Sequence, residues 1–212
     1  MNARNPVLTL AVNGVWVLSL GAVVYLKWIR PWHLRWGATD DEVNCSLPGD
    51  DQIPTATWCT TRAITIAAPP AAVWPWLVQL GYRRAGWYSY DRFDNDGVVV
   101  KRIIPELQHL AVGDMLLTDA TGGFRVEAIE PERSLVMLIH GAAMGMDADI
   151  SSALVLNPIG QQHTRLILRA RADFRGWREK LWGWLLFDAG DFVMMRKMLL
   201  GIKERAECLH TV

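Results

Sequence analysis

The chain has 212 residues, which fits one compact domain plus an appendage, because domains usually run to about 100–200 residues. Its 22 basic and 22 acidic residues balance, so the sequence lacks the positive field that nucleic-acid binding needs. Hydrophobic residues make up 51% and charged residues 21%, which excludes a disordered chain and predicts apolar surface facing lipid or a ligand. Cys45, Cys59 and Cys208 form no CxxC pair and no disulfide framework, which favours a reducing compartment.

The first 36 residues predict a membrane anchor. Residues 7–26 read VLTLAVNGVWVLSLGAVVYL and carry no charge, and a helix of that length spans a hydrocarbon layer of roughly 30 Å. Trp28, Trp32 and Trp36 then recur every four residues among basic residues, which is typical of an interfacial segment. More basic residues follow the span than precede it, which predicts a single-pass membrane protein with a cytoplasmic C-terminal domain. A signal peptide and a buried soluble helix are the alternatives.

Residues 37–58 are rich in acidic residues, contain Pro48 and Pro54, and show no sustained apolar period. This composition predicts a linker or a surface-hugging extension. The folded domain is then expected over residues 59–208.

That domain is expected to open with a strand at residues 61–67 and a helix that begins at Pro69–Pro70, is kinked at Pro75 and ends at Gly81. Three strands with tight turns follow at 115–119, 124–131 and 134–141, which predicts an antiparallel meander. Two further strands are expected at 150–158 and 164–174. The last of them alternates apolar residues with Arg165, Arg169 and Arg171, which predicts one dry face and one solvated face.

A long helix is expected over residues 177–207, with a continuous apolar stripe that contains Phe192 and Met195. Asp188 falls near the middle of this stripe. A carboxylate is costly there unless it is hydrogen-bonded, paired or protonated. Asp188 is therefore either a functional group or a structural carboxylate paired with an arginine of the sheet.

The order of these elements, with the segments ITIAAPPAAVWPWL and TRLILRARADF, resembles the START-like superfamily called SRPBCC, which includes polyketide cyclase/dehydrase and lipid-transfer domains. The blocks RAGWYSYD, IIPELQ, VGD and RKMLLGIKERAE resemble one actinobacterial-type branch of that family. The resemblance covers roughly residues 59–208. It implies an α+β helix-grip fold, in which a curved antiparallel sheet surrounds a long C-terminal helix and leaves a hydrophobic cavity. A single transmembrane helix is expected before this domain.

Candidate site residues are spread over several of these elements. In RAGWYSYDRFD, the aromatic rings could line the mouth of the cavity while tyrosine hydroxyls and Asp91 hold a polar group of the ligand, or they could form a structural plug. His140 ends an apolar strand and could face the cavity or be a hydrogen-bonded edge residue. The candidate ligand-binding residues are Trp87, Tyr88, Tyr90, Asp91, Glu106, His140, Met144, Trp184, Asp188, Phe192 and Met195.

Three functions remain open at this point. The first is a membrane-anchored domain that binds a hydrophobic small molecule or lipid, with the membrane as its other partner. The second is a cyclase- or isomerase-like enzyme in which Asp188 acts with Tyr88 or His140 as catalytic acid and base. The third is an interaction scaffold whose cavity is filled by its own side chains. The sequence has no GxSxG, P-loop, GxGxxG or HExxH motif, so we expect no cofactor and no metal.

Overall fold

The computed structural model describes residues 19–143, 146–183 and 188–210. The chain divides into two compact units, residues 1–34 and residues 35–212, and each is considered by itself. In the first unit, residues 19–24 are helical, Tyr25–Ile29 form the π-helix η1 and Arg30–Leu34 form α2. The Tyr25 hydroxyl lies 3.2 Å from His33 Nε2, and this contact links η1 to α2.

The structure corrects the prediction of a single-pass membrane protein. Residues 7–18 of the predicted span lie outside the described residues. Within the part of the chain that is described, no helix combines the length and the apolar character that crossing a membrane requires. The described part of this helical stretch, residues 19–34, carries Lys27, Arg30 and His33 in its second half.

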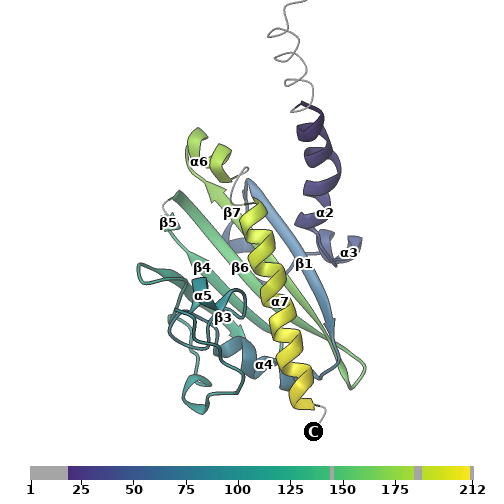
Figure 1. Cartoon of the computed structure of the whole chain (residues 1–212), viewed down its shortest axis with the longest axis vertical. Helices are drawn as coiled ribbons and strands as arrows, with labels where there is room; N and C mark the ends of the chain where they lie inside the picture. Colours follow the sequence, from purple (N-terminus) through teal and green to yellow (C-terminus); the bar gives the residue numbers. More distant parts are fainter. Residues whose placement is uncertain (1–18, 144–145, 184–187, 211–212) are drawn as a thin grey trace, which may run out of the picture. The chain divides into compact units, whose positions relative to one another are not determined.

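The second unit is an α+β domain, as the sequence predicted. Six antiparallel strands follow the order β1-β7-β6-β4-β3-β2, and the short strand β5 pairs with β6 (Figure 1). The strands are β1 (Trp58–Ile66), β2 (Met115–Leu117), β3 (Gly123–Glu130), β4 (Ser134–Ile139), β5 (Ala142–Ala143), β6 (Met146–Ile159) and β7 (His163–Phe174). The helices are α3 (Asp40–Asn44), η2 (Asp50–Gln52), α4 (Pro70–Val78), α5 (Asp91–Asp94), η3 (Pro105–Leu107), α6 (Trp177–Trp182) and α7 (Asp188–His210).

Helix α7 crosses one face of the sheet, and the core lies between them (Figure 1). Leu199 and Ile202 of α7 pack with Leu154 of β6 and Leu166 of β7, and all four have no accessible surface. A cavity that could hold even one water molecule would leave its lining side chains with some accessible surface. This part of the helix–sheet interior is therefore filled by side chains, as protein cores usually are. It holds no hydrophobic cavity of the kind implied by the family resemblance.

The opposite face of the sheet is covered by residues 37–57, here called the outer segment. Ala38 and Leu47 of this segment pack on a small apolar cluster of the sheet. The members of that cluster are Ala63, Val136, Ala153, Val155 and Ile167. The stretch that the sequence offered as a linker or a surface-hugging extension thus belongs to the same compact unit as the sheet.

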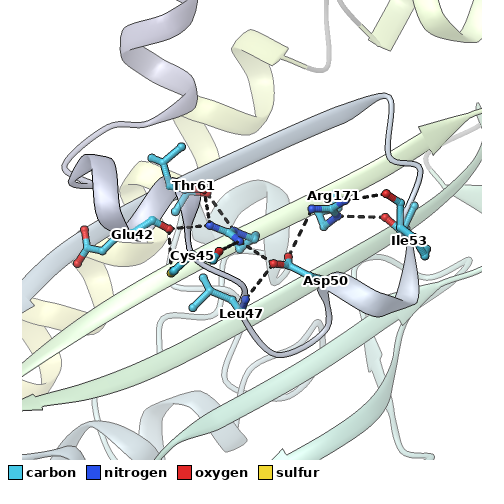
Figure 2. Close-up of polar contacts among 10 residues, drawn as sticks. Glu42, Cys45, Leu47, Asp50, Ile53, Thr61 and Arg171 are labelled. Atoms are coloured by element: carbon cyan, nitrogen blue, oxygen red, sulfur yellow. Dashed lines mark hydrogen bonds and ion pairs between the residues drawn. The ribbon is translucent and has the colours of Figure 1, made fainter.

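Arginines of β7 hold the outer segment in place. The Arg169 side chain is only 4% exposed. Its Nη1 donates to the Cys45 carbonyl and to the Asp50 carboxylate, both at 2.7 Å, and its Nη2 donates to the Glu42 carbonyl at 2.6 Å (Figure 2). Arg171 donates to the Ile53 carbonyl at 3.1 Å (Figure 2). The expectation of a solvated arginine face is therefore wrong, because an acidic segment of the same chain folds onto it.

Candidate functional site

A surface groove, here called the α7 groove, lies between residues 88–101 and residues 197–208 of α7 and has a volume of about 320 Å³. Residues 88–101 contribute one wall, formed by Tyr88, Ser89, Asp91, Val99 and Lys101. A second cavity of about 360 Å³ is also lined by Val99 and Lys101. The two hollows therefore adjoin along this segment, and neither is lined by a residue of the sheet.

Helix α7 contributes the other wall through Lys197, Glu204, Arg205 and Cys208. The last three follow Lys197 by seven, eight and eleven residues, which places all four side chains on one helix face. None of these four residues was among the predicted site residues, because the apolar stripe of the predicted helix pointed to residues facing the sheet. Their spacing along the helix indicates a shared face and could have predicted this wall.

The backbone at the base of the groove is strained. Tyr88 has φ 55°, in the left-handed region that bulky residues rarely occupy. Helix α7 approaches this residue closely at Gly201, where a Cβ atom would clash with the Tyr88 carbonyl oxygen. Strained backbone of this kind costs about 1–3 kcal/mol and is often found at binding sites. Gly201 thus permits the contact that closes the base of the groove.

Several contacts hold the Tyr88 side chain in its conformation. Its hydroxyl accepts a hydrogen bond from Gln79 Nε2 at 2.8 Å and donates to the Trp76 carbonyl at 3.2 Å. The Arg205 guanidinium lies 4.4 Å from the centre of the tyrosine ring, and its Nε donates to the Val100 carbonyl at 2.9 Å. Burial raises the pKa of Tyr88 well above its ordinary value, so the phenol stays protonated. The groove is therefore built on a fixed aromatic support.

Two polar atoms in the groove wall are buried and have no hydrogen-bond partner among the residues described. They are Ser89 Oγ and Asp91 Oδ1. Ser89 is only 3% exposed, and its backbone N–H donates to Asp94 Oδ2 at 3.1 Å. Burial also raises the pKa of Asp94. Both oxygens have almost no accessible surface, so a molecule in the groove would contact other atoms of these residues.

The structure places two of the predicted residues, Tyr88 and Asp91, in this groove and the other aromatic and acidic candidates elsewhere. Trp87 is 8% exposed, and its indole N–H donates to the Leu117 carbonyl at 3.0 Å, outside the groove lining. Tyr90 is 42% exposed and also lies outside the lining. Glu106 lies exposed on η3.

Asp188 lies at the other end of α7, in a buried polar cluster that joins the helix to β1. Its carboxylate accepts a hydrogen bond from the Trp58 indole N–H. One turn later, Asp191 pairs with Arg62 at 2.6 Å, and the Arg62 guanidinium lies 5.5 Å from the Phe192 ring. Burial raises the pKa of Asp191, and the charge of Arg62 opposes this effect.

The three acid–base candidates do not meet in one place. Tyr88 contacts α7 at Gly201, thirteen residues after Asp188, which is about 20 Å along a helix. The His140 side chain is 62% exposed and pairs with Asp149 at 3.2 Å. A general acid and a general base must both reach one substrate; Tyr88 and Asp188 are too far apart for this, and Asp188 is fully buried whereas His140 is exposed.

The remaining predicted ligand-binding residues are Met144, Trp184 and Met195. Met195 is partly buried against the core, whereas Met144 and Trp184 lie outside the described residues. Over residues 19–143, 146–183 and 188–210, no group of three or more His, Cys, Asp or Glu side chains could hold a metal ion.

No protein-family model matches the sequence, and no curated protein matches it. Among solved structures, the chain is similar to protein NE0264 from Nitrosomonas europaea, with 15% identity and a TM-score of 0.47 over 73% of this chain and 97% of that one. It is similar to protein CV1439 from Chromobacterium violaceum, with 15% identity and a TM-score of 0.45 over 70% of this chain and 96% of that one. It also resembles the di-domain ARO/CYC protein BexL from the BE-7585A biosynthetic pathway, with 12% identity and a TM-score of 0.45 over 74% of this chain and 48% of that one. Similarity at this level assigns neither a family nor an activity.

Proposed function

We propose that the domain of residues 35–212 binds a small organic molecule in the α7 groove. The observation that carries this proposal is a groove of about 320 Å³ that lies beside the left-handed backbone of Tyr88. Strained backbone of this kind is often found where a protein binds a ligand.

The size and rigidity of the groove support this proposal. Ligand sites usually measure about 300–1,000 Å³, so a groove of about 320 Å³ suits a ligand at the small end of the range. Its base is fixed by the contacts of Tyr88 with Gln79 and Arg205. A site that is already formed loses little entropy when a ligand binds.

The proposed ligand is only partly apolar. Val99 is 51% exposed at the groove and offers an apolar contact, while the other lining residues are mainly polar or charged. An acyl chain held between sheet and helix would need the space that Leu154, Leu199 and Ile202 fill. The proposed ligand is therefore still a small molecule, but its binding site is the α7 groove and not the helix–sheet interior.

The test is a fragment screen on the full chain by saturation-transfer NMR. The decisive variant is Cys208→Trp, which places a bulky ring in the groove from an exposed position. The matched control is Ala189→Trp, at an exposed position in the first turn of the same helix. We expect a set of fragments to bind the unmodified protein and the Ala189→Trp variant but not the Cys208→Trp variant. Fragments that bind all three proteins equally, or a screen without binders at about 1 mM, would contradict the proposal.

A further inference from the structure

We infer that the segment Val98–Lys101 binds an extended, acidic peptide strand of a partner protein. The strand pairs with the free backbone edge of this segment and places its carboxylates beside Lys101 and Arg102. The inference concerns a second site, next to the α7 groove, and goes beyond the binding of a small molecule.

One edge of this segment is bonded to the rest of the domain. Every second carbonyl accepts a hydrogen bond from a side chain: Val98 from Asn95 Nδ2 at 2.9 Å, Val100 from Arg205 Nε at 2.9 Å and Arg102 from Gln79 Nε2 at 3.2 Å. In an extended chain successive residues face opposite sides, so bonds to one side at every second residue indicate an extended backbone. The segment therefore resembles a strand that is bonded along a single edge.

The other edge of the segment is free. Val99 and Lys101 face this side, and their backbone N–H and C=O groups make no hydrogen bond with any residue that the structure describes. Both residues are exposed, Val99 to 51%. The chain bends at Arg102, so the extended stretch ends there. Val99 and Lys101 thus alternate donors and acceptors along an open edge, which is the pattern that an added strand pairs with.

The charge beside this edge favours an acidic strand. A hollow of about 360 Å³ is lined only by residues 99–104, and these include Lys101 and Arg102 but no carboxylate. Both side chains are exposed, and neither makes an ion pair within the described part of the chain. The carboxylates of the α7 groove, Asp91 and Glu204, do not line this hollow. Unpaired cations on an open surface attract a partner of opposite charge.

The sequence indicates that the strand comes from another protein. Residues 1–18, which lie outside the described part, contain no aspartate or glutamate. The acidic outer segment is already bound to the arginines of β7. Pairing with a second copy of the chain would bring Lys101 and Arg102 of both copies into one site without a carboxylate. The exposed Val98 and Val99 add cross-strand contacts for apolar side chains of the partner strand.

The experiment measures the binding of labelled peptides to the full chain by fluorescence anisotropy. The probe is the acetylated peptide TVEVTVEVT, which alternates apolar and acidic residues, and the matched control replaces both glutamates by glutamine. We expect the acidic peptide to bind with a Kd below about 1 mM and the glutamine peptide about fivefold more weakly, as surface ion pairs allow.

Hydrogen exchange of the unmodified protein locates the peptide. The acidic peptide should slow the exchange of the Val99 and Lys101 amides, because these N–H groups become hydrogen-bonded. Val99→Pro removes one of them without removing a hydrogen bond within the described structure, and it should abolish binding at about 1 mM. Val99→Thr keeps the N–H group and the branched side chain and should bind the peptide as the unmodified protein does.

Charge variants test the acidic class. The double variant Lys101→Gln with Arg102→Gln should bind the acidic and the glutamine peptides equally. The control is Lys180→Gln, at an exposed position of α6 outside the segment, which should keep the difference between the two peptides.

Four results would overturn the inference. The first is no binding of the acidic peptide at about 1 mM. The second is binding that leaves the Val99 and Lys101 amides unprotected. The third is equal binding of the acidic and glutamine peptides to the unmodified protein. The fourth is a dimer of the chain, seen by sedimentation, that Val99→Pro dissociates, because a second copy would then occupy the edge.

Discussion

Replacement of Arg169 by Met should release the outer segment and destabilise the domain. The methionine keeps much of the apolar stem of the arginine but supplies no donor. The change removes the hydrogen bonds to the Cys45 and Glu42 carbonyls and the ion pair with Asp50. Asp50 keeps weaker support from Arg171, whose Nη1 lies 3.6 Å from its carboxylate.

The expected loss of stability follows from the burial of the Arg169–Asp50 ion pair. Removing one partner of a buried ion pair costs about 3–5 kcal/mol. Asp50 is 16% exposed and keeps its hydrogen bond from the Leu47 backbone N–H at 2.9 Å, so the lower end of that range applies. We therefore expect Arg169→Met to lower the free energy of unfolding by about 3 kcal/mol, a large part of the 5–15 kcal/mol of a typical domain.

Urea unfolding of the full chain, followed by circular dichroism, measures this difference, and hydrogen exchange reports on the outer segment. The control is Arg133→Met, which removes an exposed pair in which the arginine is 73% and Glu130 is 55% accessible. Such a pair contributes about 0–1 kcal/mol. A loss below about 1 kcal/mol for Arg169→Met, with unchanged amide protection over residues 37–57, would refute the reasoning.

Two further predictions concern the groove and pH. Gly201→Ala should lower stability by about 1–3 kcal/mol, because the new methyl group meets the Tyr88 carbonyl oxygen. Gly190→Ala is the control: nothing lies close to this glycine, so the change should raise stability by about 0.5–1 kcal/mol. Thermal unfolding of both variants measures the two effects. The Arg165 hydrogen bond lowers the pKa of Glu42 in the folded state, so its stabilisation is present above the ordinary pKa of a glutamate and is lost as the pH falls through the lowered value. Glu42→Gln should therefore reduce stability at about pH 7 but not at about pH 2, and an equal loss at both would contradict this account.

Local sequence patterns predicted most strands of the sheet and the C-terminal helix, although the single helix expected over residues 177–207 is described as two helices, α6 and α7. In β7, Leu166 and Leu168 alternate with arginines, and the structure buries the leucines against α7. Short connections explain the order from β2 to β7, whereas the pairing of β1 with β7, the last strand of the chain, is long-range. Asp188 was expected to need a partner within the apolar stripe, and the structure supplies the Trp58 indole.

The outer segment and the groove depend on contacts between residues far apart in the sequence. Glu42 binds Arg165, which lies 123 residues later, and no local pattern indicates that pairing. The groove wall at Ser89 exists because Tyr88 adopts a strained backbone beside Gly201. The sequence analysis selected aromatic residues for a cavity mouth, and so it missed the charged face of α7.

The outer segment also decides where a recombinant version of this domain should begin. A protein trimmed to the boundary suggested by sequence, residue 59, would lack the residues that cover Ala153, Val155 and Ile167. It would also leave Arg169 without the carbonyl groups and the carboxylate that it binds. An uncovered apolar sheet face is a site for aggregation. Starting at residue 35 preserves the covering and is the better choice for expression.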